Sequence, residues 1–353
     1  MNKRVEWIDI AKGYGILFVI IGHLYLQDSF LTTQIYTFHM PLFFFLSGYV
    51  FSAKKYNFNE FIKRKAKTIL VPYFALGVCM IIFCFALMSK SIDTTSIDYY
   101  NLIKKFLIQR RMWTLWFIAC LFWLNIMFYL IVKLHNNDYK KMGMTVVVLT
   151  IIGLTYYKLG GEALPWNIDV CFVAIFFFYL GYLFKNIPKL SDFILVKGKK
   201  AIIMFILFFI INLICGIGNN ILTGETLDMS RNNYGFVPLT FISAFGGIMC
   251  VIIFSNAFHI KAIKYLGSNS LVYYAWHQTI MITIINRLYF AFGIFQGTSI
   301  ASECVELVVS TFIICITLTI ADYIIRHSKL KFMVGIYDSK KNNCIISDKN
   351  IVA

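Results

Sequence analysis

The first apolar stretch of the chain, WIDIAKGYGILFVIIGH, carries three ionisable residues whose spacing could support chemistry: Asp9, Lys12 and His23. Asp9 and Lys12 are three residues apart, so on a helix they share a face and can pair. Lys12 and His23 are about three helical turns apart, on one stripe and separated by roughly 16 Å. That arrangement suits a long ligand with a phosphate head and a reactive tail, such as a coenzyme A thioester. A membrane-embedded histidine can equally hydrogen-bond a neighbouring helix, so both interpretations stay open.

Composition predicts the kind of element that must position these residues. Of 353 residues, 59% are hydrophobic and only 14% are charged, whereas soluble domains are about 45–50% apolar and about 25% charged. Mean hydropathy is +0.72. These values exclude a water-soluble enzyme, a coiled coil and a disordered regulator. They predict an all-α integral membrane protein.

Ten stretches are apolar enough to be membrane-spanning helices, which need about 20 residues each. They cover roughly residues 11–27, 38–53, 68–89, 113–132, 142–159, 167–184, 200–222, 236–258, 270–293 and 301–325. We therefore expect a polytopic bundle of about ten helices with both termini on one side. The transmembrane domain is predicted to cover residues 1–330, and residues 331–353 are predicted to form a cytoplasmic tail.

Charge gives the predicted orientation. The net charge of +16 would be typical of a nucleic-acid-binding protein, but membrane proteins also concentrate Lys and Arg in cytoplasmic loops. With a cytoplasmic N-terminus, segments on that side carry 24 of these residues and the opposite side carries 6. The distribution predicts a cell-membrane protein with cytoplasmic termini, and it explains the charge without nucleic acid.

One predicted external segment, residues 90–112, departs from this charge rule because it contains five lysines and arginines, Arg110 and Arg111 among them. A charged cluster is commonly a solvated surface. The alternative is an acceptor-side element, partly helical and lying on the membrane, that meets an anionic or sugar-phosphate ligand.

Further polar residues fall inside or at the edge of predicted spans, where an ionisable group is a candidate for function. His39 either binds an acceptor or makes a hydrogen bond at a helix start, and His277 either lines a tunnel or bonds a neighbouring helix. Ser47 and Gly48 favour close helix packing over a nucleophilic serine, because no G-x-S-x-G motif is present. The nine cysteines form no C-x-x-C pair, so neither a disulfide framework nor a metal site is predicted.

Longer strings resemble a known family. The segment from Asp9 to His23, in which ten residues separate a basic residue from a histidine, and FHMPLFFFLSGYVF at 38–51 resemble acyltransferase family 3. The resemblance is more specific to the fucose 4-O-acetylase-like branch. It extends, in the family's order, through FIKRKAKTILVPY (61–73), LWFIACLF (115–122), PWNIDVCFVAIFFFYLGYLF (165–184) and LGSNSLVYYAWHQ (266–278). The family more often has arginine in place of Lys12, and lysine lacks the bidentate fork for phosphate.

The resemblance implies an enzyme that transfers an acyl group, usually acetyl, from cytoplasmic acetyl-CoA to a hydroxyl of a surface glycan, a lipid-linked sugar or a related small molecule. His23 would be the general base, with a covalent acyl-histidine as the alternative. Asp9 and Lys12 would form the donor-side charge pair. The other implied residues are donor-binding Arg4, Arg64, Lys65 and Lys67, and acceptor-binding or tunnel-lining His39, His277, Trp116 and Arg111.

Simpler roles are open for some of these residues. Arg64, Lys65 and Lys67 satisfy the positive-inside rule without a ligand, and Trp116 suits an interfacial anchor. Acetyl-CoA would act as a substrate, and no metal or permanently bound cofactor is expected. The partners implied are acetyl-CoA, the sugar acceptor and the lipid bilayer.

Two other functions are alternatives to the enzyme. A polysaccharide or lipid-sugar transporter built on inverted repeats should show paired, Gly/Pro-interrupted segments in its two halves, and we find none in the sequence. A structural partner in a glycan-assembly complex has no need for the Lys12–His23 stripe. Coenzyme A binding that depends on Lys12 and the basic segment would favour the enzyme.

Overall fold

The computed structural model describes residues 5–24, 29–53, 56–88, 99–225, 227–295 and 299–337. These residues form helices and loops, and the one β-type pairing among them is an isolated bridge between Asp228 and Asn233. The prediction of an all-α protein is therefore confirmed for this part of the chain.

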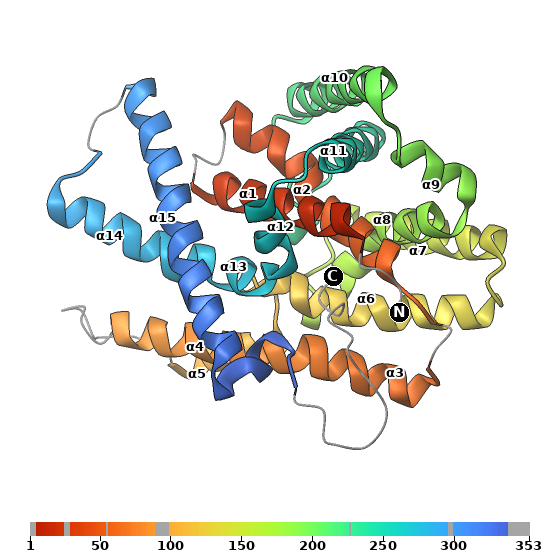
Figure 1. The fold of residues 1–353 in the computed structure, drawn as a ribbon. Helices are drawn as coiled ribbons and strands as arrows, with labels where there is room; N and C mark the ends of the chain where they lie inside the picture. The colour runs from red at the N-terminus through yellow and green to blue at the C-terminus, as the bar shows by residue number, and fades with distance from the viewer. Residues whose placement is uncertain are drawn as a thin grey trace.

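Nine long helices make up most of the bundle shown in Figure 1: α1 (Glu6–Leu24), α2 (Phe30–Val50), α4 (Val71–Met88), α6 (Trp116–Leu134), α7 (Tyr139–Lys158), α8 (Ile168–Asn186), α10 (Gly198–Thr223), α11 (Val237–Ala257) and α15 (Ile300–His327). The shorter α-helices of the described residues are α3 (Phe58–Lys65), α5 (Tyr99–Ile108), α9 (Pro188–Ile194), α12 (Lys261–Ser268), α13 (Ser270–Trp276) and α14 (Thr283–Phe292). Two π-helical segments, η1 (Ala66–Leu70) and η4 (His277–Ile282), join α3 to α4 and α13 to α14. Short 3-10 turns occupy η2 (Pro165–Asn167), η3 (Met229–Arg231) and η5 (Lys329–Val334).

Seven helical runs in the described part of the chain are long and apolar enough to cross a membrane. They correspond to seven of the ten predicted spans. The other three predicted spans, 38–53, 142–159 and 270–293, fall on α2, α7 and the α13–η4–α14 run, which contain more polar residues. The chain is a multi-pass membrane protein, and ten is an approximate number of spans.

The ten-span arrangement assigns each helix end to one side of the membrane. In the structure, ends assigned to the same side contact one another. Glu6 at the start of α1 pairs with Lys264 of α12, and the Tyr182 hydroxyl at the end of α8 donates to Asn137 Oδ1 at 2.7 Å. At the opposite ends, the amide of Arg111 donates to Asn167 Oδ1 at 3.0 Å. These contacts fit the expected alternation of helix direction. Which side is cytoplasmic is still a prediction from charge.

Helix α2 lies at the centre of the bundle, in contact with α1, α8, α10 and α11. Nearly all of its side chains from Thr32 to Tyr49 are buried. By contrast, only 28% of the most apolar part of α10 and 17% of that of α15 are buried. Their outward Ile, Leu, Val and Phe side chains are suited to contact with lipid.

Helices α2 and α8 cross at two glycines. A Cβ atom on Gly48 would lie 1.8 Å from the carbonyl oxygen of Phe178, and one on Gly181 would lie 1.9 Å from that of Phe45. The close packing at Gly48 that the sequence predicts is confirmed. Small residues at a crossing bring two backbones together, which is a common way to join helices within a membrane.

We expect Gly48→Ala to destabilise the protein, because the added methyl group must push α2 away from α8. Overpacking of this kind costs about 1–3 kcal/mol. Thermal unfolding in detergent should show a lower midpoint than in the wild type. Gly218→Ala is the matched control, since a Cβ atom there meets only the Leu239 side chain, at 3.4 Å. Equal midpoints for both variants would contradict the close crossing.

Candidate active site

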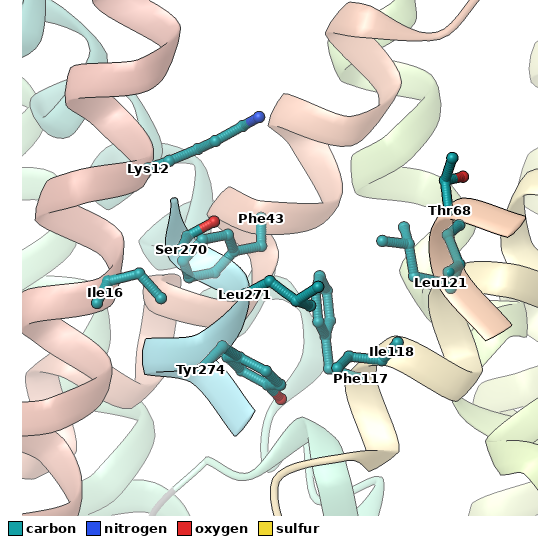
Figure 2. A pocket seen from close by; sticks show the side chains of 11 residues that line it. Lys12, Ile16, Phe43, Thr68, Phe117, Ile118, Leu121, Ser270, Leu271 and Tyr274 are labelled. Carbon is teal, nitrogen blue, oxygen red and sulfur yellow. The ribbon is translucent and has the colours of Figure 1, made fainter. Parts of the chain in front are cut away.

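A narrow cavity passes between α1, α2, η1, α6 and α13. Figure 2 shows Lys12 towards one end and Tyr274 towards the other. The walls are mostly apolar, and the lining residues are Lys12, Ile16, Phe43, Thr68, Ile69, Phe117, Ile118, Leu121, Ser270, Leu271 and Tyr274. Its volume is about 40 Å³, which is room for a few atoms rather than for a whole cofactor-sized molecule. Lys12 is the only cation among these lining residues.

Glycines hold the Lys12 end of α1 tightly against α12. A Cβ atom on Gly267 would lie 1.7 Å from the carbonyl oxygen of Asp9, and one on Gly13 would lie 2.1 Å from that of Ile263. The side chains of Asp9 and Lys12 are both buried, with 3% and 7% of their surface exposed. The predicted charge pair is therefore placed on a rigid, buried segment at one end of the cavity.

The three membrane-embedded histidines gather beyond the Tyr274 end. The ring centroids of His23 and His277 are 5.1 Å apart, and the ring of Tyr274 is 6.3 Å from that of His277. Tyr36 lies between His39 and His23. Its ring is 4.8 Å from that of His39, and its hydroxyl is 3.3 Å from Nδ1 of His23. The cavity therefore leads from Lys12 towards a cluster of imidazoles.

Backbone hydrogen bonds fix how two of these imidazoles present their nitrogens. Nδ1 of His277 is 3.0 and 2.9 Å from the carbonyl oxygens of Tyr273 and Tyr274, and Nδ1 of His39 is 2.9 Å from that of Ile35. Because a carbonyl only accepts, Nδ1 carries the hydrogen and Nε2 presents a lone pair in the neutral rings. Nε2 of His277 is buried without a hydrogen-bond partner among the described residues. It is available to accept a proton or hydrogen bond from a ligand.

Two of the predicted donor-binding cations, Arg64 and Lys65, lie at the end of helix α3 that leads into the cavity wall. Segment η1 supplies Thr68 and Ile69 to the cavity wall, directly after the basic helix α3. Lys65 interacts electrostatically with both Arg64 and Lys12. Lys65 thus lies within electrostatic range of Lys12, whereas the Arg64 guanidinium lies over the Tyr56 ring, 4.3 Å from its centroid.

Two other predicted donor residues are placed differently. Lys67 has an exposed side chain, and its carbonyl accepts a hydrogen bond from the Tyr337 hydroxyl at 2.8 Å. Residues Met333 and Val334 just before this contact are buried, so the segment assigned to the tail begins as a packed turn. Arg4 lies outside the described residues.

Arg111 and Trp116 lie at the end of the bundle opposite to Lys12, in the loop before α6 and at the start of α6. Nη2 of Arg111 donates to Asp169 Oδ2 at 2.5 Å, and Asn232 Nδ2 donates to the same oxygen at 2.6 Å. This buried network ties the loop before α6 to the start of α8 and to the loop at 227–235. Trp116 is buried against Phe44 and Phe117. Acceptor binding by Arg111 or Trp116 therefore stays a prediction.

Three neighbours of the histidines were not singled out from the sequence: Tyr36, Tyr274 and Asp228. Asp228 interacts electrostatically with His23 and Tyr36. With 21 tyrosines in the chain, residue type alone gave no signal. The spacing gives a signal for the two tyrosines. Tyr36 precedes His39 by three residues and Tyr274 precedes His277 by three, which places each pair on one helix face.

Comparisons with known proteins agree with the family suggested by the sequence. A family model described as "Acyltransferase domain" matches residues 5–326. Over 83 residues, the chain is 40% identical to nodulation protein NolL of Mesorhizobium japonicum, an alignment that covers 20% of this chain and 22% of that protein. The match thus spans about a fifth of the relative's length, and no solved structure matches significantly. Because the family model covers nearly the whole chain, this multi-pass membrane protein belongs to acyltransferase family 3.

Proposed function

We propose that this acyltransferase moves an acetyl group from cytoplasmic acetyl-CoA to a hydroxyl of a cell-surface glycan or of its lipid-linked precursor. The observation that carries the proposal is the cavity that begins at buried Lys12 and ends at Tyr274, beside the adjoining imidazoles of His277 and His23. Cations at one end and bases at the other match a donor whose phosphates and thioester are the two ends of one long molecule. The fucose 4-O-acetylase-like branch is our expectation for the subfamily.

The Lys12 end suits the phosphate groups of coenzyme A. Lys12 lines that end, and Lys65 of the basic helix α3 is within electrostatic range of it. Charge-assisted hydrogen bonds to phosphate are among the stronger ones in proteins. The cavity of about 40 Å³ is smaller than the arm that carries the thioester. Donor binding therefore requires the lining side chains, such as Leu121 and Leu271, to move apart.

His23 is suited to act as the general base. When Nδ1–H of His23 donates to the Tyr36 oxygen, Nε2 is free to take the proton of the acceptor hydroxyl. The hydroxyl oxygen then attacks the thioester carbonyl carbon, and the carbon–sulfur bond breaks as the tetrahedral intermediate collapses. The departing thiolate receives the proton from His23. Nε2 of His277 offers a second acceptor, which would hold the sugar by a neighbouring hydroxyl rather than by the attacking one.

The proposed orientation places the Lys12 end in the cytoplasm, where acetyl-CoA is found. It rests on the excess of lysine and arginine in the segments that share a side with the N-terminus. The histidines would then lie towards the opposite side, near the loop that carries Asp228. The protein would be in the cell membrane with both termini cytoplasmic.

The test is acetyl transfer from radiolabelled acetyl-CoA in sealed membrane vesicles of both orientations. We expect label in glycan or lipid-linked sugar only when the cytoplasmic face is accessible to the donor. Transfer from the opposite face would overturn the orientation. If the protein moves unmodified lipid-linked sugar across the membrane and transfers no label, the transporter alternative replaces the proposal.

A further inference from the structure

A second hollow lies beside the segment that carries His277. It has a volume of about 330 Å³ and is lined by Phe83, Cys84, Leu87, Trp113, Thr279, Thr283 and Arg287. Helix α4 supplies an apolar wall, and η4 with α14 supplies a polar one. Thr279, Thr283 and Arg287 follow one another at four-residue intervals, so they share a helix face. A volume above 300 Å³ is in the range of small-molecule sites.

Arg287 sets the charge of this groove. It falls inside the predicted span 270–293, and its guanidinium has no ion pair or hydrogen bond among the described residues. No acidic side chain lines the groove. A charged residue within a membrane span is costly and points to a function. The guanidinium fork binds phosphate in a bidentate manner, so an anion of that kind complements the groove.

The chain holds Trp113 in the groove at a conformational cost. Its φ angle is 51°, and Gln109 and Arg111 in the same loop have φ angles of 50° and 55°. Left-handed backbone is unusual for a bulky residue and persists only where the surroundings impose it. The Arg111–Asp169 pair and the bond from Thr114 Oγ1 to the Ala275 carbonyl, at 2.9 Å, provide that restraint. A tryptophan ring held in this way is a surface on which a sugar ring can pack.

The groove adjoins the proposed reaction centre. Thr279 comes two residues after His277 in the same π-helical segment, and the Thr114–Ala275 bond joins the Trp113 loop to the helix just before it. Phe83, Cys84 and Leu87 come from the far end of the 58–87 run, one of the apolar helices able to cross a membrane. An occupant therefore meets apolar α4, a tryptophan and an unpaired guanidinium together.

We propose that this groove binds the acyl acceptor as a lipid-anchored sugar phosphate, with the phosphate on Arg287, the sugar against Trp113 and the hydrocarbon chain along α4. This inference rests on the proposed function and deepens it, because it assigns a membrane-bound acceptor rather than a finished soluble glycan. The acceptor would enter sideways from the bilayer.

The test measures binding rather than acyl transfer, so its failure is separate from failure of the proposed function. Purified full-length protein in detergent would be titrated with undecaprenyl phosphate and followed by native mass spectrometry. We expect saturable binding of one lipid, weakened about tenfold or more in Arg287→Gln, as for loss of a hydrogen-bonded charge partner. Lys158→Gln is the charge-matched control, since Lys158 is exposed at the end of α7 and lies outside the groove.

Thr283→Leu provides a second variant, because it obstructs the polar wall and leaves Arg287 in place. It should also weaken binding, while all variants keep the wild-type midpoint of thermal unfolding in detergent as a check on folding. Wild-type affinity in both Arg287→Gln and Thr283→Leu would overturn the proposal. Equal affinity for phosphatidylglycerol would also overturn it, since the groove would then be a general site for anionic phospholipid.

Discussion

Replacing His23 with alanine should lower acetyl transfer by about 10²–10⁴-fold, the usual contribution of a general base. Acetyl-CoA binding and thermal stability should stay close to wild type, because the cations that we assign to the donor lie at the other end of the cavity. The measurement is single-turnover transfer of labelled acetyl by membranes that contain equal amounts of each protein. His277→Ala should cause a smaller loss, since that imidazole would hold a neighbouring hydroxyl of the sugar and take no proton in the reaction.

His135→Ala is the matched control for His23. This histidine lies in the segment between α6 and α7, where its Nε2 is 2.7 Å from Thr145 Oγ1, and its replacement should leave the transfer rate unchanged. The same experiment separates the two roles open to His23, because an acyl-histidine would carry label on the protein after rapid quenching. Full activity of His23→Ala would remove His23 from the mechanism.

Lys12→Ala should weaken acetyl-CoA binding by about 10–100-fold, as expected for the loss of a hydrogen bond to a charged group. The effect should fall on the KM for acetyl-CoA, with a smaller change in kcat, because Lys12 lies at the end of the cavity opposite the histidines. Equilibrium binding of labelled acetyl-CoA measures it directly. Lys12→Arg should restore binding, since arginine offers a planar fork to phosphate.

Lys140→Ala is the control, because it removes one positive charge on the same predicted side of the membrane without touching the proposed donor site. Lys140 is exposed in the first turn of α7, and its replacement should leave donor affinity unaltered. If Lys12→Ala and Lys140→Ala both bind acetyl-CoA as the wild type does, the positive-inside rule alone accounts for the lysines, and the proposed donor site is wrong.

The stripe on α1 was predictable because it depends on one helix alone. Eleven residues return to nearly the same face of an α-helix, so the sequence places Lys12 and His23 on one line whatever surrounds them. The all-α bundle was equally predictable from the apolar stretches. The packing role of Gly48 followed from residue type, but its partner, the backbone of Phe178, did not.

The cavity itself could not be predicted, because its walls come from five elements far apart in the chain. Thr68 and Ser270 are about two hundred residues apart and meet only through the packing of η1 and α13. The π-helical segments that present Thr68 and His277 also have no clear sequence signature, although such segments are frequent at functional sites. Arg111 was expected to meet an acceptor, and its buried partner Asp169 became visible only in three dimensions.

The most direct test of the central claim is an electron cryomicroscopy structure of the wild-type protein with S-(2-oxopropyl)-CoA, a ketone analogue of acetyl-CoA that cannot be cleaved. We predict the phosphates beside Lys12 and Lys65, the arm in the cavity between Phe43 and Phe117, and the carbonyl carbon next to Tyr274. An acceptor oxygen bound to His23 would then lie about 3–3.5 Å from that carbon, a distance suited to attack. Analogue bound away from the cavity, or with its carbonyl at the Lys12 end, would contradict the mechanism.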